Sequence, residues 1–384
     1  MLVLSIAGSI LFQPTARALD CIQPVFAKIV ERDVLDCFDE GLKTGEGDPV
    51  FCEMSAVVFD RTRLVLASDK TIPGAQRSAV FSFDYPGYGQ IEGPLSYHRA
   101  APFLSAIKYE DMTLTPDGAH VIATTGFDRV KKGSHEWDGY NTLMFWPVGK
   151  PDDVELVAAT SANGVSSSVS LRKKISPALV SAQFPDGVPY FKVEGLAAIP
   201  GGQLLFGIRE MGARYDDFIY TFKIVAISYQ LTDGDLSLLG DFNLIYDFDP
   251  VSQPQTQHVS ALSSIEYDAF HKRLYLLTSY ETGAANEQYG EGFGDVGLGG
   301  YLWTLSLADL KARNPPTLVL KQPGRPLLFA HKPEGLTVLN ENLVLVVHDD
   351  DRVLGRPNVE NPETQFSRGA HQAAYSLVHV PGGQ

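Results

Sequence analysis

Acidic side chains recur at the two ends of five similar segments of the chain. Each segment consists of an acidic or small polar residue, an apolar run, a turn, a second apolar run and a polar or acidic end. Carboxylates grouped in this way can ligate calcium, a hard cation that prefers oxygen, or act as general acids and bases. The segments are residues 53–69, 110–128, 194–210, 263–281 and 334–350.

The residues between these ends predict a β-hairpin in every segment. Turn residues such as Pro116, Asp117 and Gly118 separate two short β-rich runs. The first residue of one strand and the last residue of its partner lie at the same end of a hairpin, so the segment ends should share one face. The resulting pairs are Glu53 with Asp69, Glu110 with Asp128, Glu194 with Glu210, Ser263 with Glu281, and Glu334 with Asp350.

Further strand-like runs bring most of the repeated units to four strands, which is typical of a β-propeller blade. The last unit offers only one clear strand after its hairpin, at residues 373–380. Residues 24–30 are therefore expected to add the outer strand and close the ring, since closure removes exposed sheet edges. The sequence predicts an all-β propeller of five visible four-stranded blades. A sixth blade is the alternative, if residues 19–52 or 161–190 contain a degenerate one.

If each hairpin is the innermost pair of its blade, the motif glutamates gather around one mouth of the central channel. Like charges raise one another's pKa, so these carboxylates need cations or N–H donors. In one interpretation they bind calcium, which then polarises a substrate. In the other, each glutamate accepts hydrogen bonds from the next blade and locks the ring, and repetition in every blade favours this role for most copies. The metal-ligand candidates are Glu53, Asp69, Glu110, Asp128, Glu334 and Asp349.

Departures from the repeat indicate where a singular site would lie. The fourth segment has Ser263 in place of glutamate and offers Glu266 later. The fifth ends in residues 348–352, three acids between a histidine and an arginine, which could bind calcium, hold an acid/base pair or form a solvated loop. The catalytic candidates are Glu194, Glu210, His348 and Asp350, and the substrate-binding candidates are Lys70, Arg129, Arg209 and Arg352.

The N-terminus predicts export. An apolar run precedes Ala16 and Ala18, which fits a signal peptide over residues 1–18 and is too short to span a membrane. The N-terminal segment would then cover residues 19–52 and the propeller residues 53–384, in the periplasm or outside the cell. Two of the three cysteines, Cys21, Cys37 and Cys52, could form a disulfide there, and their spacing leaves the pairing open.

Charge and motif searches exclude several classes of function. The formal net charge is -15, which disfavours nucleic acid and anionic membrane partners. The chain has no G-x-S-x-G, H-E-x-x-H or Walker motif, so ordinary serine-esterase, zinc-protease and nucleotide chemistry have no support. The expected partner is a small anionic or ester substrate bound by a monomer.

Short motifs within the blades resemble the phytase-like propeller family, also described as "esterase-like activity of phytase". They are Glu194-Gly195-Leu196 with Pro200-Gly201-Gly202, Glu334-Gly335-Leu336, and Leu66-Ala67-Ser68-Asp69. The resemblance spans residues 53–380. It implies a propeller in which acids bridge calcium ions while lysine and arginine hold an anionic substrate.

Two hypotheses of different classes follow. The leading one is an exported hydrolase, assisted by calcium, that acts on a phosphoester or carboxylic ester at the channel mouth. The alternative is a non-catalytic propeller that binds a carbohydrate, peptide or protein on the same face.

Overall fold

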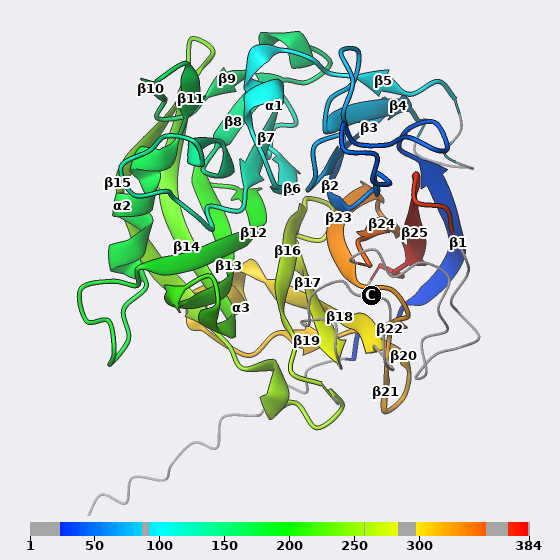
Figure 1. Cartoon of the computed structure of the whole chain (residues 1–384). Helices are drawn as coiled ribbons and strands as arrows, with labels where there is room; N and C mark the ends of the chain where they lie inside the picture. The colour runs from blue at the N-terminus through cyan, green and yellow to red at the C-terminus, as the bar shows by residue number, and fades with distance from the viewer. Residues whose placement is uncertain are drawn as a thin grey trace, which may run out of the picture.

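The chain folds as a five-bladed β-propeller (Figure 1). The computed structural model describes residues 24–86, 91, 93–256, 258–282, 297–350 and 368–382. Five antiparallel sheets surround a common channel, and within each blade consecutive strands pair from the inside outward. This confirms the predicted fold class and the number of visible blades.

The first strand of each blade lines the channel. Blade 1 contains β2 (Met54–Phe59), β3 (Arg63–Ser68), β4 (Val80–Asp84) and β5 (Ser96–Tyr97), and blade 2 contains β6 (Tyr109–Leu114), β7 (His120–Thr125), β8 (Leu143–Pro147) and β9 (Glu155–Leu156). Blade 3 contains β12 (Tyr190–Ile199), β13 (Gln203–Arg214), β14 (Asp217–Thr232) and β15 (Asp235–Asp247). Blade 4 contains β16 (Ala261–Asp268), β17 (Arg273–Thr282), β18 (Gly297–Ser306), β19 (Thr317–Leu318) and the short β22 (Leu328–Phe329). Blade 5 contains β23 (Pro333–Asn340), β24 (Leu343–His348), β25 (Gln372–His379) and β1 (Lys28–Asp36).

The inner strands touch in a closed cycle. Strand β2 contacts β6, β6 contacts β12, β12 contacts β16, β16 contacts β23, and β23 returns to β2. The predicted hairpins are therefore the innermost pairs of their blades. No sixth blade exists among the described residues: the candidate stretch 161–190 gives the small ribbon β10 (Thr160–Ala162) and β11 (Val165–Ser167), and helix α2 (Arg172–Ile175).

An N-terminal strand closes the ring, as expected. Strand β1 runs antiparallel to β25, with Lys28 opposite His379 and Asp36 opposite Gln372. The strand starts inside the predicted stretch and extends further, because its partner β25 offers eight residues for pairing. The remaining small elements are α1 (Ala101–Ser105), α3 (Leu307–Ala312), β20 (Leu320–Gln322) and β21 (Arg325–Pro326). No helix in the described part of the chain combines the length and the apolar character that a membrane crossing requires.

The core is divided into layers between neighbouring blades. Successive side chains of a strand point to opposite faces, so each strand serves two layers. In β3, Leu64 and Leu66 pack with blade 5, whereas Val65 and Ala67 pack with blade 2. The same alternation produces apolar layers between blades 2 and 3, 3 and 4, and 4 and 5. These apolar layers hold neighbouring blades together, so that polar residues of the inner strands can line the channel.

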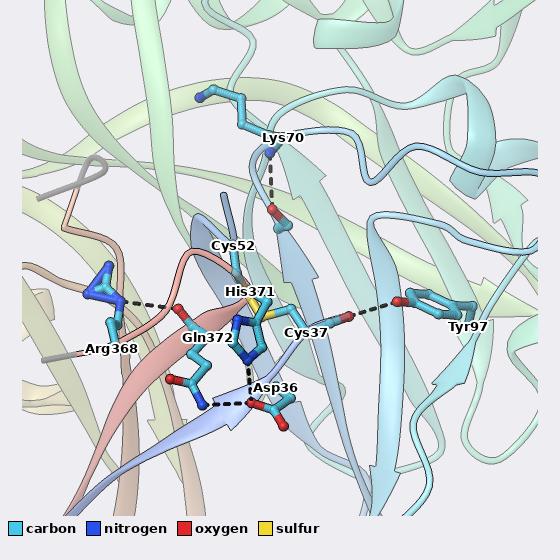
Figure 2. The surroundings of a disulfide bond; sticks show 9 residues. Asp36, Cys37, Cys52, Lys70, Tyr97, Arg368, His371 and Gln372 are labelled. Carbon is cyan, nitrogen blue, oxygen red and sulfur yellow. Dashed lines mark hydrogen bonds and ion pairs between the residues drawn. A yellow bond between two sulfur atoms is a disulfide. The ribbon is translucent and has the colours of Figure 1, made fainter. Parts of the chain in front are cut away.

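A disulfide joins Cys37 to Cys52 and anchors the segment between β1 and β2 (Figure 2). The main-chain N–H groups of both cysteines donate to blade 5, to the carbonyl oxygens of His371 and Ala370, each over 2.8 Å. The Tyr97 hydroxyl donates to the Cys37 carbonyl oxygen over 2.8 Å. The bond thus connects the closing blade to blade 1 directly before Glu53. Cys21 lies outside the described residues.

Candidate functional site

A β-bulge occurs at the same place in all five inner hairpins. The register between first and second strand skips one residue at Ser55, Glu110, Glu194, Ser263 and Glu334. Bulges commonly re-aim a side chain, and here they mark the channel mouth. In blade 1 the bulge residue is Ser55, so Glu53 is not the structural equivalent of the other motif glutamates. The predicted motif position of blade 1, Glu53, therefore lies two residues before the position that is equivalent to Glu110, Glu194 and Glu334.

When the five blades are compared by their bulges, a second ring of equivalent positions lies two residues before each bulge. Blades 2, 3 and 5 have Lys108, Lys192 and Lys332 there, whereas blade 1 has Glu53 and blade 4 has Ala261. A lysine two residues before a glutamate is thus a repeated motif of three blades. This spacing can be read from the sequence, but it was not among the predicted motifs.

These lysines neutralise the motif glutamates. Lys192 Nζ lies 3.3 Å from Glu110 Oε1 and also pairs with Glu194, and Lys332 Nζ lies 3.1 Å from Glu334 Oε1. Lys108 Nζ lies 3.0 Å from Asp128 Oδ2 and 3.8 Å from Glu110 Oε1. We refer to these groups together as the charge belt: Lys108, Lys192, Arg209 and Lys332 with Glu110, Asp128, Glu194, Glu281 and Glu334.

The charge belt also connects neighbouring blades. Lys192 of blade 3 reaches Glu110 of blade 2, and Lys332 of blade 5 lies 2.7 Å from Glu281 of blade 4. Arg209 of blade 3 donates to Ser279 Oγ of blade 4 over 2.7 Å and lies 3.2 Å from Glu194 Oε2. The belt is thus a set of buried ion pairs around the mouth. Burying such pairs has a high desolvation cost. Removal of one partner is strongly destabilising, because it leaves a buried charge without its counter-charge.

Neighbouring carboxyl groups of the belt differ in proton affinity. Burial raises the pKa of Glu110 well above its usual range. Burial also acts on Glu194, but Arg209 and Lys192 outweigh it and lower the pKa of that carboxyl. Burial raises the pKa of Glu334 to about 7, since Lys332 offsets only part of the effect. Pairs of carboxyl groups with separated pKa values are typical of acid/base sites.

The junction between blades 5 and 1 has a different composition. Glu53, Asp69 and Asp349 bring three carboxylates together there, with one oxygen of each within 4.8 Å of the others. Lys70 Nζ lies 2.8 Å from Glu53 Oε2 and also bonds Asp69. Burial lowers the pKa of Lys70, but Asp69, Glu53 and Asp349 outweigh it and raise the pKa. We call Glu53, Asp69 and Asp349 the triacid cluster.

The cluster arises from exchanges at equivalent positions. Glu53 stands where three other blades have lysine. The other two acids of the cluster lie opposite this position, on the second-strand side of their hairpins. The Asp69 N–H donates to the Glu53 carbonyl oxygen, and the Asp349 N–H donates to the Lys332 carbonyl oxygen. The residue opposite is Gly126 in blade 2 and Ser279 in blade 4. Blade 3 has Glu210 at this pairing position, opposite Lys192. Blade 1 alone of the five blades has acids at both positions, and Asp349 of blade 5 adds the third carboxylate at their junction.

Asp350 and His348 lie deeper in blade 5. Asp350 Oδ2 lies 2.6 Å from both His331 Nδ1 and Arg368 Nη1. These two partners outweigh burial and lower the pKa of Asp350. His348 Nε2 lies 2.9 Å from Ser376 Oγ, and burial lowers the pKa of this imidazole well below its usual value. Both side chains are buried, so their described contacts are those of structural groups, and their catalytic roles stay predictions.

The remaining predicted residues fall into two groups. Lys70 and Arg129 lie at the accessible edge of the mouth, with side chains 45% and 25% exposed. Arg209 is buried among Glu194, Glu281 and Tyr220, and Glu210 accepts a hydrogen bond from the Tyr190 hydroxyl. Arg352 lies outside the described residues. Lys70, Arg129, Arg209 and Glu210 therefore lie at the mouth, whereas His348 and Asp350 are buried in blade 5, and the roles of all six stay predictions.

Below the mouth, Asp111 ties three inner strands together. Its Oδ2 accepts from the main-chain N–H of Leu196 (2.8 Å), that of Ile265 (3.2 Å) and the Ser264 hydroxyl (3.0 Å). The expected lock between blades through backbone N–H groups exists, but Asp111 provides it here, whereas the neighbouring Glu110 pairs with lysines. Asp111 was not among the residues predicted from the sequence.

Glu266 lines the same channel and makes stability depend on pH. Burial raises its pKa to about 8 from 4.5, although Thr113 donates a hydrogen bond to it. The folded chain therefore keeps a proton that the unfolded chain releases, and stability should fall as pH rises from 4.5 to 8. Glu266→Gln should flatten this dependence and stabilise the protein at pH 8 by on the order of a few kcal/mol. Urea unfolding across this range measures the effect, with the exposed Glu341→Gln as control. Parallel profiles for wild type and Glu266→Gln would contradict the assignment.

Comparisons with known proteins give structural similarity only. No family model matches the sequence, and no curated protein matches it. The luciferin-regenerating enzyme is 9% identical over 87% of this chain and 94% of its own, with a TM-score of 0.38. An aldose sugar dehydrogenase from Streptomyces coelicolor is 11% identical over 92% and 99% of the two chains (TM-score 0.35). A glycosyl hydrolase from Bacteroides ovatus is 12% identical over 94% and 92% (TM-score 0.36). Membership of the phytase-like family stays a prediction, and the propeller fold rests on the five sheets.

Proposed function

We propose that the protein is a hydrolase whose active site is the channel mouth, where it cleaves an anionic phosphoester or a carboxylic ester with the help of calcium. The triacid cluster carries this proposal, because it brings three buried carboxylates together at one blade junction, where Lys70 bonds two of them. Elsewhere around the mouth, lysines and Arg209 pair with the acids.

The residues of the triacid cluster fit a calcium ion in chemistry and burial. Calcium binds carboxylate oxygens at about 2.3–2.6 Å, so ligand atoms around one ion lie within about 5 Å of one another. The carboxylates of the cluster meet this condition. Lys70 Nζ now bonds two of them, which indicates that the cluster attracts a cation. Glu110, Asp128 and Glu334 fit a metal less well, since among the described residues they belong to no such group of three carboxylates.

The protein's own groups would bind the substrate and move protons. When bound, calcium would act as a Lewis acid on an ester or phosphoryl oxygen. Lys70 has a half-exposed side chain beside the cluster, so it can reach the anionic group of a substrate. Glu334 has a pKa of about 7, because burial raises it, and it would exchange a proton near neutral pH. Glu194, which Arg209 holds ionised, would stay a fixed negative charge.

The test is turnover of p-nitrophenyl phosphate and p-nitrophenyl acetate with calcium present. Asp349→Asn removes one charge from the triacid cluster without changing its size and should lower kcat/KM by about a hundredfold or more, in line with the loss of a metal's electrostatic contribution. Asp39→Asn, an exposed carboxylate at the molecular surface, is the matched control and should keep wild-type turnover. Equal turnover in both variants would contradict the proposed site, and no turnover by the wild type would contradict hydrolysis of these ester classes.

The binding alternative has its own support in blade 3. Strand β13 has 12 residues, twice the 6 of the corresponding β3 and β7, and β14 has 16 residues, against 5 in the corresponding β4 and β8. Their connecting turn exposes the aromatic side chain of Tyr215 near the mouth. A propeller that only binds a ligand would retain calcium binding and ligand affinity while showing no turnover of either ester.

A further inference from the structure

An exposed tyrosine stands over the edge of the charge belt. Tyr215 occupies the turn of the β13–β14 hairpin, between Arg214 and Asp217, and is 55% exposed. Its ring contacts the Arg129 guanidinium, whose Cζ lies 4.5 Å from the ring centroid, and Lys108 Nζ lies 5.9 Å from the same centroid. A large aromatic residue in a solvated turn gains little by burial. Its placement over two cations therefore needs another explanation.

Arg129 is held rigidly in this position. Its guanidinium lies between the rings of Tyr215 and Tyr140, at 4.5 and 4.7 Å from their centroids. Nε and Nη2 both donate to Asp128 Oδ2, over 3.1 and 2.7 Å. Among the described residues no acceptor engages the remaining nitrogen, Nη1. One donor edge of a fixed guanidinium is thus available beside an aromatic face.

Two more aromatic rings of blade 3 pack in a chain from Tyr215, and the nearer one, Tyr190, is buried. Tyr190 packs edge-on against Tyr215 with centroids 6.2 Å apart, and Phe218 lies 5.7 Å from Tyr190. The Tyr190 hydroxyl donates to Glu210, which adds a fixed polar group beside the rings. Aromatic faces with polar groups at their edges suit a ring that is apolar on its faces and hydroxylated at its rim, as a sugar is.

The charges of this edge limit the ligand to a monoanion. Asp128 already accepts from both Lys108 and Arg129, and Glu110 lies 3.8 Å from Lys108 Nζ. The cations are therefore largely compensated by carboxylates. A dianionic phosphate would meet this negative charge closely, whereas a carboxylate carries a single charge and matches the open guanidinium edge.

We infer that Tyr215 and Arg129 form a substrate subsite for a six-membered sugar ring that carries a carboxylate, with the ring on the Tyr215 face and the carboxylate at Arg129. This inference rests on the proposed function and names its substrate class, a sugar acid that is esterified on a hydroxyl group and keeps its carboxylate free. It assigns a role to the long hairpin of blade 3, which the other blades lack.

Binding of sodium glucuronate, followed by saturation-transfer-difference NMR, tests the subsite with glucose, acetate and glucose 6-phosphate as comparison probes. Glucuronate should bind more tightly than all three. Tyr215→Ala should weaken its binding about tenfold, the loss expected for one stacking face, and Tyr215→Phe should stay close to wild type. Phe270→Ala is the matched control: Phe270 is 59% exposed in the β16–β17 turn, which lies at the other end of its blade from the mouth. It should bind glucuronate as the wild type does.

Several results would overturn the inference. They are absence of glucuronate binding, equal binding by Tyr215→Ala and wild type, and tighter binding of glucose 6-phosphate. Melting curves of Tyr215→Ala establish whether the variant is folded, and Tyr215→Phe tests the ring independently. Failure here would leave the calcium and turnover results intact, whereas loss of calcium binding with retained glucuronate binding would reject the proposed function alone.

Discussion

Replacing Arg209 with methionine is expected to lower the free energy of unfolding by about 3–5 kcal/mol. Arg209 is buried and lies 3.2 Å from Glu194, 3.8 Å from Glu281 and 4.0 Å from Glu210. Methionine fills much of the same volume, so the main loss is electrostatic. Carboxylates that the arginine neutralised would remain buried beside one another. Urea unfolding at neutral pH measures the change.

Two further variants isolate the cause. Arg214→Met removes an arginine from the same strand, but its side chain is 71% exposed, so the unfolding free energy should change by less than about 0.5 kcal/mol. Adding Glu194→Gln to Arg209→Met removes one stranded charge and should restore part of the stability. If Arg209→Met were as stable as the wild type, or if Glu194→Gln destabilised it further, the ion pairs would not be what stabilises the mouth.

The second large effect concerns Asp111, whose replacement with alanine should cost about 3–5 kcal/mol. Alanine leaves two buried main-chain N–H groups, those of Leu196 and Ile265, without their acceptor and removes the bond from Ser264. Asp111→Asn keeps one carbonyl oxygen and should lose less than alanine does. The exposed Asp241→Ala is the control and should be close to wild type. Equal stability of all three variants would mean that Asp111 does not connect the blades.

The propeller could be predicted because its determinants are local. Short apolar runs, such as that of β3, and turn residues, such as those at Pro116–Gly118, recur along the chain. The incomplete last blade also implied a strand from the N-terminus, and β1 provides it. Pattern and turn chemistry determine these features, so a single sequence reveals them.

The detailed site could not be predicted because it depends on the strand register. A bulge moves Ser55 to the position that glutamate holds in blades 2, 3 and 5, and hydrophobic alternation alone does not locate a bulge. The pairing of Lys192 with two glutamates from different blades likewise depends on how neighbouring blades face each other. In the sequence, Asp111 is simply a second acid beside Glu110. The structure shows that Asp111 bonds the inner strands of neighbouring blades, whereas Glu110 pairs with lysines.

The mouth has a part that repeats between blades and a part that departs from the repeat. In the charge belt, repeated lysines pair with repeated glutamates and join neighbouring blades. At the junction of blades 5 and 1, Glu53, Asp69 and Asp349 break the repeat and collect negative charge. The disulfide between Cys37 and Cys52 fixes the chain directly before Glu53. Its closed loop of about 15 residues would contribute about 3 kcal/mol by chain entropy. A covalent anchor at this junction suits a site that must keep its geometry.

Thermal unfolding with calcium and then with excess chelator tests the central claim most directly. For the wild type, calcium at a hundred times its dissociation constant should add about 2.7 kcal/mol to the unfolding free energy and raise the melting temperature, and the chelator should reverse the change. Asp349→Asn should lose most of this response, whereas Asp39→Asn should keep it. A melting temperature that is the same with calcium and with chelator would contradict a calcium site at the junction of blades 5 and 1.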